Sequence, residues 1–237
     1  MASRREQKEQ LRREREQREA ASKASRGRQR LIGYAVGGGI ILLAVIAAVA
    51  LLGGGDDGTA SGNVLPDGGE VPAIAEAETV AAGAKQAGCE LKSYRATGRE
   101  HIADISQIVK YASKPPTSGN HFQEWADDGA YGENVPDVKM IVHALEHGRI
   151  VIWFKKSLPA DQRAALKAYF DEDSYQMLLV PDMTGMKYEV AATAWNRDPA
   201  PNGTGRLLGC PKFNDDFFTA AEVFKDEHRS RGPEPVP

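Results

Sequence analysis

The most apolar part of the chain is residues 31–52, a run rich in Leu, Ile, Val, Ala and Gly that contains no charged residue. At about 1.5 Å per residue, a helix of this length crosses a hydrocarbon core of about 30 Å, which predicts a single transmembrane helix. A cleaved signal peptide is the alternative. The run is longer than the apolar region of such a peptide, usually about 7–15 residues, and no clear Ala-x-Ala cleavage site follows it, so a membrane anchor is favoured.

Polar and turn-forming residues come next and then give way to mixed sequence. Gly, Asp, Ser and Thr are abundant in residues 53–80, which predicts a flexible linker. Beyond it, helical and strand patterns at short spacing predict one α+β domain over residues 81–230. The polar, proline-containing end of the chain, residues 231–237, is predicted to be a disordered tail.

Within the domain, alternating or continuous apolar runs predict strands, and apolar residues three to four positions apart predict helices. Strands are expected at residues 105–111, 149–154, 177–180 and 188–195. Helices are expected at residues 158–170 and 213–227. No internal repeat is visible, which fits a domain with one core.

Residues 138–147 are ambiguous between helix and strand. Ile141, Val142 and Leu145 fall on one face of a helix, whereas Val138, Met140 and Val142 fall on one face of a strand. As a helix, the segment would have an aspartate before it as a cap and a glycine after it as a left-handed stop. Both interpretations remain open at this stage.

Charge is distributed unevenly along the chain. Residues 1–30 hold eleven Lys/Arg and five Glu, a net charge of +6. The whole chain has a net charge of −3, so residues 31–237 carry a net charge of −9. An acidic body argues against nucleic-acid binding, which needs a concentrated positive face. The basic segment predicts a cytoplasmic tail over residues 1–30, and the positive-inside rule then places the domain outside the cytoplasm. We therefore expect a single-pass protein of the cell membrane whose residues 31–52 contact the lipid bilayer.

The chain contains two cysteines, Cys89 and Cys210. In an extracytoplasmic domain this predicts one disulfide that joins the beginning of the domain to its end. Two free thiols are the less favoured alternative. Neither a Cys-x-x-Cys redox motif nor a cysteine zinc site is present in the sequence.

Three motifs are specific enough to suggest a family. They are Pro-Pro-Thr-Ser-Gly-Asn-His at 115–121, Gly-Ala-Tyr at 129–131, and Val-His-Ala-Leu-Glu-His-Gly-Arg-Ile-Val-Ile-Trp at 142–153. Together they resemble the signature of domain-of-unknown-function family 3105, whose members are mostly bacterial and often membrane-anchored. The resemblance implies an extracytoplasmic domain and supplies no established activity.

Four of the five histidines lie in the region that carries these motifs: His101, His121, His143 and His147. On a helix, His143 and His147 would be side by side and could share one ion, whereas on a strand they would stand about 13 Å apart. His121 would be a third ligand, and His101 a fourth ligand or a supporting residue. Without cysteine ligands, zinc or copper(II) fits best. The alternative is that these histidines are structural and bond to carbonyls and carboxylates.

The function predicted from these patterns is transition-metal binding by a membrane-anchored extracytoplasmic protein. One alternative is a metal-free interaction or scaffold domain that binds an envelope protein through residues 115–122 and nearby aromatics. Another is a zinc-dependent hydrolase, since His143, Glu146 and His147 match the pattern His-x-x-Glu-His. That match is short and no third acidic ligand can be assigned, so the sequence leaves the question of enzymatic activity open.

Overall fold

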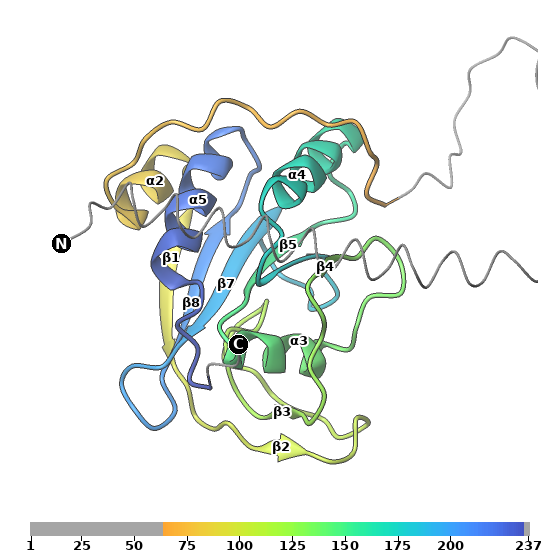
Figure 1. Cartoon of the computed structure of the whole chain (residues 1–237), viewed down its shortest axis with the longest axis vertical. Coiled ribbons are helices and arrows are strands. Elements are labelled where there is room, and N and C mark those ends of the chain that lie inside the picture. The colour runs from red at the N-terminus through yellow and green to blue at the C-terminus, as the bar shows by residue number, and fades with distance from the viewer. Residues whose placement is uncertain (1–63, 235–237) are drawn as a thin grey trace, which may run out of the picture. The chain divides into compact units, whose positions relative to one another are not determined.

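A six-stranded mixed sheet forms the centre of the domain in the computed structural model, which describes residues 64–234 (Figure 1). Its strands follow in the order β1 (Glu90–Arg95), β8 (Thr204–Cys210), β7 (Val190–Asn196), β5 (Ile150–Phe154), β6 (Met177–Pro181) and β4 (Gly129–Ala130). β5, β6 and β4 run parallel, and the remaining neighbours are antiparallel. With helices added on its faces, the domain has the predicted α+β class.

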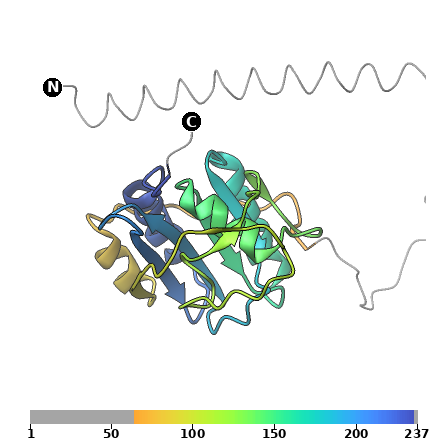
Figure 2. The same ribbon diagram turned by 90° about the horizontal axis from the view of Figure 1, so that it is seen from below.

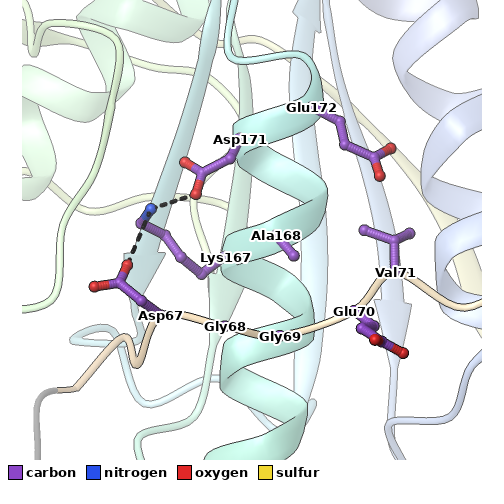
Figure 3. A pocket seen from close by; sticks show the side chains of 9 residues that line it. All are labelled: Asp67, Gly68, Gly69, Glu70, Val71, Lys167, Ala168, Asp171 and Glu172. Atoms are coloured by element: carbon purple, nitrogen blue, oxygen red, sulfur yellow. Dashed lines mark hydrogen bonds and ion pairs between the residues drawn. The ribbon is translucent and has the colours of Figure 1, made fainter.

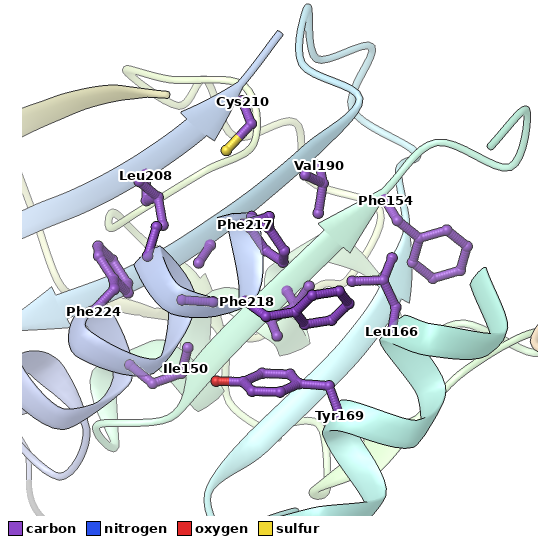
Figure 4. Packing of buried hydrophobic residues seen from close by; sticks show 14 of the residues in the cluster. Ile150, Phe154, Leu166, Tyr169, Val190, Leu208, Cys210, Phe217, Phe218 and Phe224 are labelled. Atoms are coloured by element: carbon purple, nitrogen blue, oxygen red, sulfur yellow. The ribbon is translucent and has the colours of Figure 1, made fainter. Parts of the chain in front are cut away.

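Three helices cover one face of the sheet: α2 (Val80–Gln86), α4 (Ala160–Glu172) and α5 (Asp216–His228) (Figure 1). Strand residues alternate between the two faces, so Ile150 and Ile152 of β5 face these helices whereas Val151 and Trp153 point to the other side. Aromatic rings from α4 and α5 fill the space between helices and sheet (Figure 4). This larger core lies on the face of the sheet opposite to α3 and includes residues of all three helices.

The opposite face carries α3 (Val138–Glu146) and the long segment between β1 and α3 (Figure 2). That segment includes the short parallel pair β2 (His101–Ile102) and β3 (His121–Phe122). Because it lies over α3, the side of the helix that faces away from the sheet is buried as well. Polar side chains of α3 are therefore enclosed between the helix and this segment.

The ambiguous segment is a helix. The carboxylate of Asp137 caps α3 by accepting a hydrogen bond from Lys139 N–H at 2.8 Å. Gly148 follows with a φ of +83°, the left-handed conformation that ends many helices. Ile141 and Leu145 are fully buried against the sheet, so packing decides in favour of the helical pattern.

The other predicted elements correspond to β5, β6, β7, α4 and α5, with one exception. The strand predicted at 105–111 is wrong: these residues form turns and irregular structure, and Ile108 is 87% exposed, so the apolar residues there have no sheet to face. The sequence does not predict β8, because the glycines in this strand favour a loop. One of them, Gly209, is required, since a Cβ there would lie 2.5 Å from the ring of Tyr188.

Residues on both sides of the predicted domain, 81–230, make contacts with it. Before residue 81, Leu65 is buried in the larger core and Arg163 donates a hydrogen bond to Val64 O. Asp67 pairs with Lys167 where the chain crosses α4 beside a surface pocket (Figure 3). Beyond residue 230, the chain packs on the end of α3 instead of leaving the domain. Apart from the buried side chain of Leu65, backbone groups and the charged side chain of Asp67 make these contacts, which composition alone does not reveal.

The predicted cytoplasmic tail, transmembrane helix and first part of the linker lie outside the described residues. Within residues 64–234, none of the helices has the length and apolar character needed to cross a membrane. Cys89 and Cys210 lie at disulfide-bonding distance with their Cα atoms 4.1 Å apart, which confirms the predicted pairing. The bond joins the segment after α2 to the end of β8.

Candidate metal centre

Four side chains from three elements meet where the segment between β1 and α3 packs on α3. His101 comes from β2, His121 from β3, and His143 and Glu146 from α3; each offers one ligand atom, and these atoms all lie within 4.8 Å of one another. The three imidazole rings are 4.6–4.8 Å apart between centroids. The sequence suggests His121, His143 and His147 as the main ligands and His101 as a fourth ligand or a supporting residue; the structure groups His101, His121 and His143 and leaves His147 outside the group. We call the four residues the His3Glu cluster.

The β2–β3 pair explains why two histidines so far apart in the sequence meet. His101 and His121 are direct partners in the register of this parallel pair. The motif at 115–121 holds β3 in place: residues 115–119 are buried, and Gly119 has a φ of +135°. Asn120 Oδ1 accepts a hydrogen bond from Glu100 N–H at 3.1 Å and ties the motif to β2. Residues 115–119 therefore expose little surface in the described part of the chain.

Two backbone carbonyls set the orientation of the buried rings. His121 Nδ1 lies 2.8 Å from Gly119 O, and His143 Nδ1 lies 2.7 Å from Phe122 O. A carbonyl oxygen only accepts hydrogen bonds, so Nδ1 carries the proton in both rings. In the neutral form of either ring, Nε2 then carries the lone pair, and His121 Nε2 lies within the cluster, 3.0 Å from Glu146 Oε2. This is the arrangement that metal-binding histidines usually show.

Glu146 is fully buried, with a relative exposure of 0%. Its Oε1 accepts a hydrogen bond from Arg99 Nε at 2.7 Å, and its Oε2 lies 3.0 Å from His121 Nε2 and 3.7 Å from His101 Nε2. The contact with His121 lacks hydrogen-bond geometry, so His121 Nε2 and Glu146 Oε2 are both buried without a hydrogen-bond partner among residues 64–234.

The charges of the cluster suit a cation. Burial acts to raise the pKa of the Glu146 carboxyl, but His121 and Arg99 outweigh burial and lower the pKa to about 2. Burial, followed by repulsion from His121, lowers the pKa of His143 to about 4. At neutral pH the glutamate is thus ionised and His143 is neutral, the forms that bind metal ions.

Comparison with known proteins adds the family. A family model described as a protein of unknown function, DUF3105, matches residues 103–234, more than half of the chain. The chain belongs to the DUF3105 family. Three members of the His3Glu cluster lie within the matched range, and His101 precedes it by two positions. No curated protein and no solved structure matches the chain.

His147 of this DUF3105 domain lies beside the cluster and is not one of its four members. Its ring is 4.6 Å from that of His143, as expected for residues one helical turn apart, and its Nδ1 lies 2.8 Å from Glu234 O. The hydrolase interpretation needs His143 and His147 as ligands with Glu146 as the base. In the structure Glu146 is instead grouped with His101, His121 and His143 as a possible ligand. The arrangement therefore does not favour Glu146 as a base beside a metal ion held by His143 and His147.

The cluster has one open side. The side chain of His101 is 45% exposed, whereas the other three members are buried. Trp125, itself 44% exposed, packs edge-on against His143 and His147. The remaining histidine of the chain, His228, lies at the end of α5 and is not part of the cluster.

Sequence reasoning misses Arg99 and gives Glu146 a different role. Arg99 holds the carboxylate of Glu146 from 47 positions away, a separation that no local pattern reveals. The His-x-x-Glu-His match draws attention to Glu146 only as a base. Its position one turn after His143 on a helix is the available signal that both side chains share a face.

Proposed function

We propose that this domain binds one divalent transition-metal ion, zinc or copper(II), through the His3Glu cluster. The supporting observation is the pair His121 Nε2 and Glu146 Oε2, which lie buried 3.0 Å apart without a hydrogen bond. Buried polar atoms nearly always have partners, because leaving one unpaired costs free energy. A shared cation would satisfy both atoms at once.

The donor set and its dimensions fit such an ion. Imidazole suits zinc and copper, and the two cysteines are committed to the disulfide. Ligand atoms about 2.0–2.2 Å from a tetrahedral ion are about 3.3–3.6 Å from one another. The four donor atoms already lie within 4.8 Å of one another, so small side-chain movements would complete the coordination.

We also propose that residues 31–52 anchor the protein in the membrane and that the domain works outside the cytoplasm. The uncharged run and the basic segment before it support this orientation. The bond between Cys89 and Cys210 gives further support, because disulfides persist in oxidising compartments.

The test of metal binding uses the full-length protein purified in mild detergent. Elemental analysis, combined with melting curves before and after addition of zinc or copper(II), should show one bound ion per chain and a higher melting temperature. An ion present at 100 times its Kd adds about 2.7 kcal/mol to the free energy of unfolding.

His143→Ala should abolish both effects. His228→Ala is the matched control, since it removes another buried histidine outside the cluster and should preserve binding. If the wild-type protein binds no ion and its melting temperature does not move, the proposal fails. The interaction domain without a metal then becomes the better description.

A further inference from the structure

The last described residues return to the C-terminal end of α3, next to the His3Glu cluster. Ser230 N–H donates to Gly148 O at 2.8 Å, and Glu234 N–H donates to Glu146 O at 3.1 Å. Arg197 N–H donates to Arg231 O at 2.8 Å and holds the middle of the segment. The final carbonyls of a helix have no hydrogen-bond donors within the helix. N–H groups of residues 230–234 therefore take the place of water as donors at this end of α3. We call residues 230–234 the C-terminal strap.

Glu234 alone makes three contacts around the metal centre. Besides its bond to Glu146 O, its carbonyl oxygen accepts a hydrogen bond from His147 Nδ1 at 2.8 Å. Its carboxylate Oε2 lies 3.4 Å from Arg99 Nη2, and Arg99 Nε in turn holds Glu146 Oε1. One residue therefore contacts the backbone of a cluster member, the neighbouring histidine and the arginine that orients the cluster carboxylate.

The strap approaches α3 too closely for any side chain at its centre. A Cβ on Gly232 would lie 2.0 Å from Glu146 O and 2.3 Å from Gly148 N. The other strap residues are exposed or only partly buried, and none belongs to either hydrophobic core. The contacts of the strap are thus concentrated on the end of α3 instead of the cores that stabilise the fold.

We propose that the C-terminal strap is a positioning element of the metal centre, with Glu234 as its principal residue. The inference rests on the proposed metal binding. By fixing the last turn of α3 and the Arg99–Glu146 pair, the strap keeps the carboxylate aimed at His101 and His121. Partners that orient metal ligands in this way typically account for about 10- to 100-fold in affinity.

The test measures the zinc affinity of the full-length protein in detergent by competition with a chromophoric chelator. Gly232→Ala forces the strap away from Glu146, and we expect the Kd for zinc to rise about 10- to 100-fold. A chain that ends at Pro233 lacks Glu234, and its Kd for zinc should rise by a similar factor. This second variant keeps the test decisive if Gly232→Ala folds poorly. Glu234→Gln retains the backbone contacts and weakens only the ion pair with Arg99, whose groups are partly exposed, so its Kd should rise less than that of Gly232→Ala.

Gly88→Ala separates positioning from general destabilisation. Gly88 has a φ of +66°, and a Cβ added there would have no atom within 4 Å, so alanine strains the backbone without a clash. It should lower the melting temperature and leave the Kd for zinc unchanged. The inference is overturned if Gly232→Ala and the shortened chain bind zinc as tightly as the wild type. That result would leave metal binding itself intact, whereas a wild type that binds no zinc would overturn both proposals.

Discussion

At the scale of single residues, the centre depends on one buried carboxylate. Glu146 is ionised, fully buried and shared between Arg99 and the histidines. A buried charge is tolerated only where it is paired, so the residues around Glu146 have to supply positive charge. Arg99 supplies part of it, and in our account the metal ion supplies the rest.

Glu146→Gln should therefore weaken zinc binding more than it disturbs the fold. The amide keeps the shape of the side chain and loses the negative charge, so we expect the Kd for zinc to rise at least about tenfold, the lower range seen for outer partners of metal ligands. Competition with a chromophoric chelator measures this Kd. Glu227→Gln, at a carboxylate that is 57% exposed on α5, is the control and should bind normally. Equal affinity in both variants would remove Glu146 from the ligand set.

His228 predicts how the stability of the metal-free protein depends on pH. Burial, with repulsion from Arg206 and Arg231, lowers its pKa from 6.5 to about 4. As the pH falls, the unfolded chain takes up this proton first, so stability is complete above about pH 6.5 and declines toward about pH 4. Asn196 Nδ2 lies 3.2 Å from its Nδ1, and Glu227 Oε1 lies 3.9 Å from its Nε2.

Urea unfolding of metal-free wild type and His228→Gln between pH 4 and 7.5 tests this predicted loss of stability at low pH. The free energy of unfolding of the variant should fall less steeply with decreasing pH. Part of the decline should remain, because the pKa of His143 is lowered in the same direction. Identical slopes for the two proteins would mean that His228 is not held in its neutral form by the fold.

At the scale of elements, α3 is the part of the structure on which the centre is built, and its first turn is fixed by Asp137. Asp137→Ala should cost about 1 kcal/mol in the free energy of unfolding, the usual value for a lost helix cap. Asp215→Ala is a matched control, since Asp215 precedes α5 without a side-chain capping bond. Urea denaturation compares the two, and an equal loss of stability in both would contradict the assigned cap.

The elements also show which parts of the structure the sequence can predict. β5, β6, β7, α4 and α5 have clear apolar periodicity, and the spacing of His143 and Glu146 puts two cluster members on one face once α3 is known to be helical. The predicted pairing of His143 with His147 does not identify the cluster, because His147 lies outside it. β8 and the C-terminal strap escape prediction because their glycines allow close approach between distant segments, which only the folded chain makes visible. Arg99 is missed because its role depends on a contact between the segment before β2 and α3, 47 positions away in the sequence.

At the scale of the whole molecule, two cores lie on opposite faces of one sheet, with the disulfide in the larger core and the metal centre beside the smaller one. Replacing Cys89 and Cys210 by serine should lower the free energy of unfolding by about 4–5 kcal/mol, the chain-entropy value for a loop closed over 121 positions. Because the centre is on the other face, the Kd for zinc should not change while the protein is folded. Urea unfolding and chelator competition test the two statements, and a loss of affinity in the folded variant would contradict the separation.

X-ray absorption spectroscopy of the zinc-loaded, full-length protein tests the central claim most directly. Our account predicts four nitrogen or oxygen ligands at about 2.0–2.1 Å, with the scattering pattern of three imidazoles and no sulfur. Loss of one imidazole in His121→Ala would assign the ligand. A zinc ion with sulfur ligands, with one imidazole or none, or with a spectrum unchanged by His121→Ala would contradict the His3Glu centre.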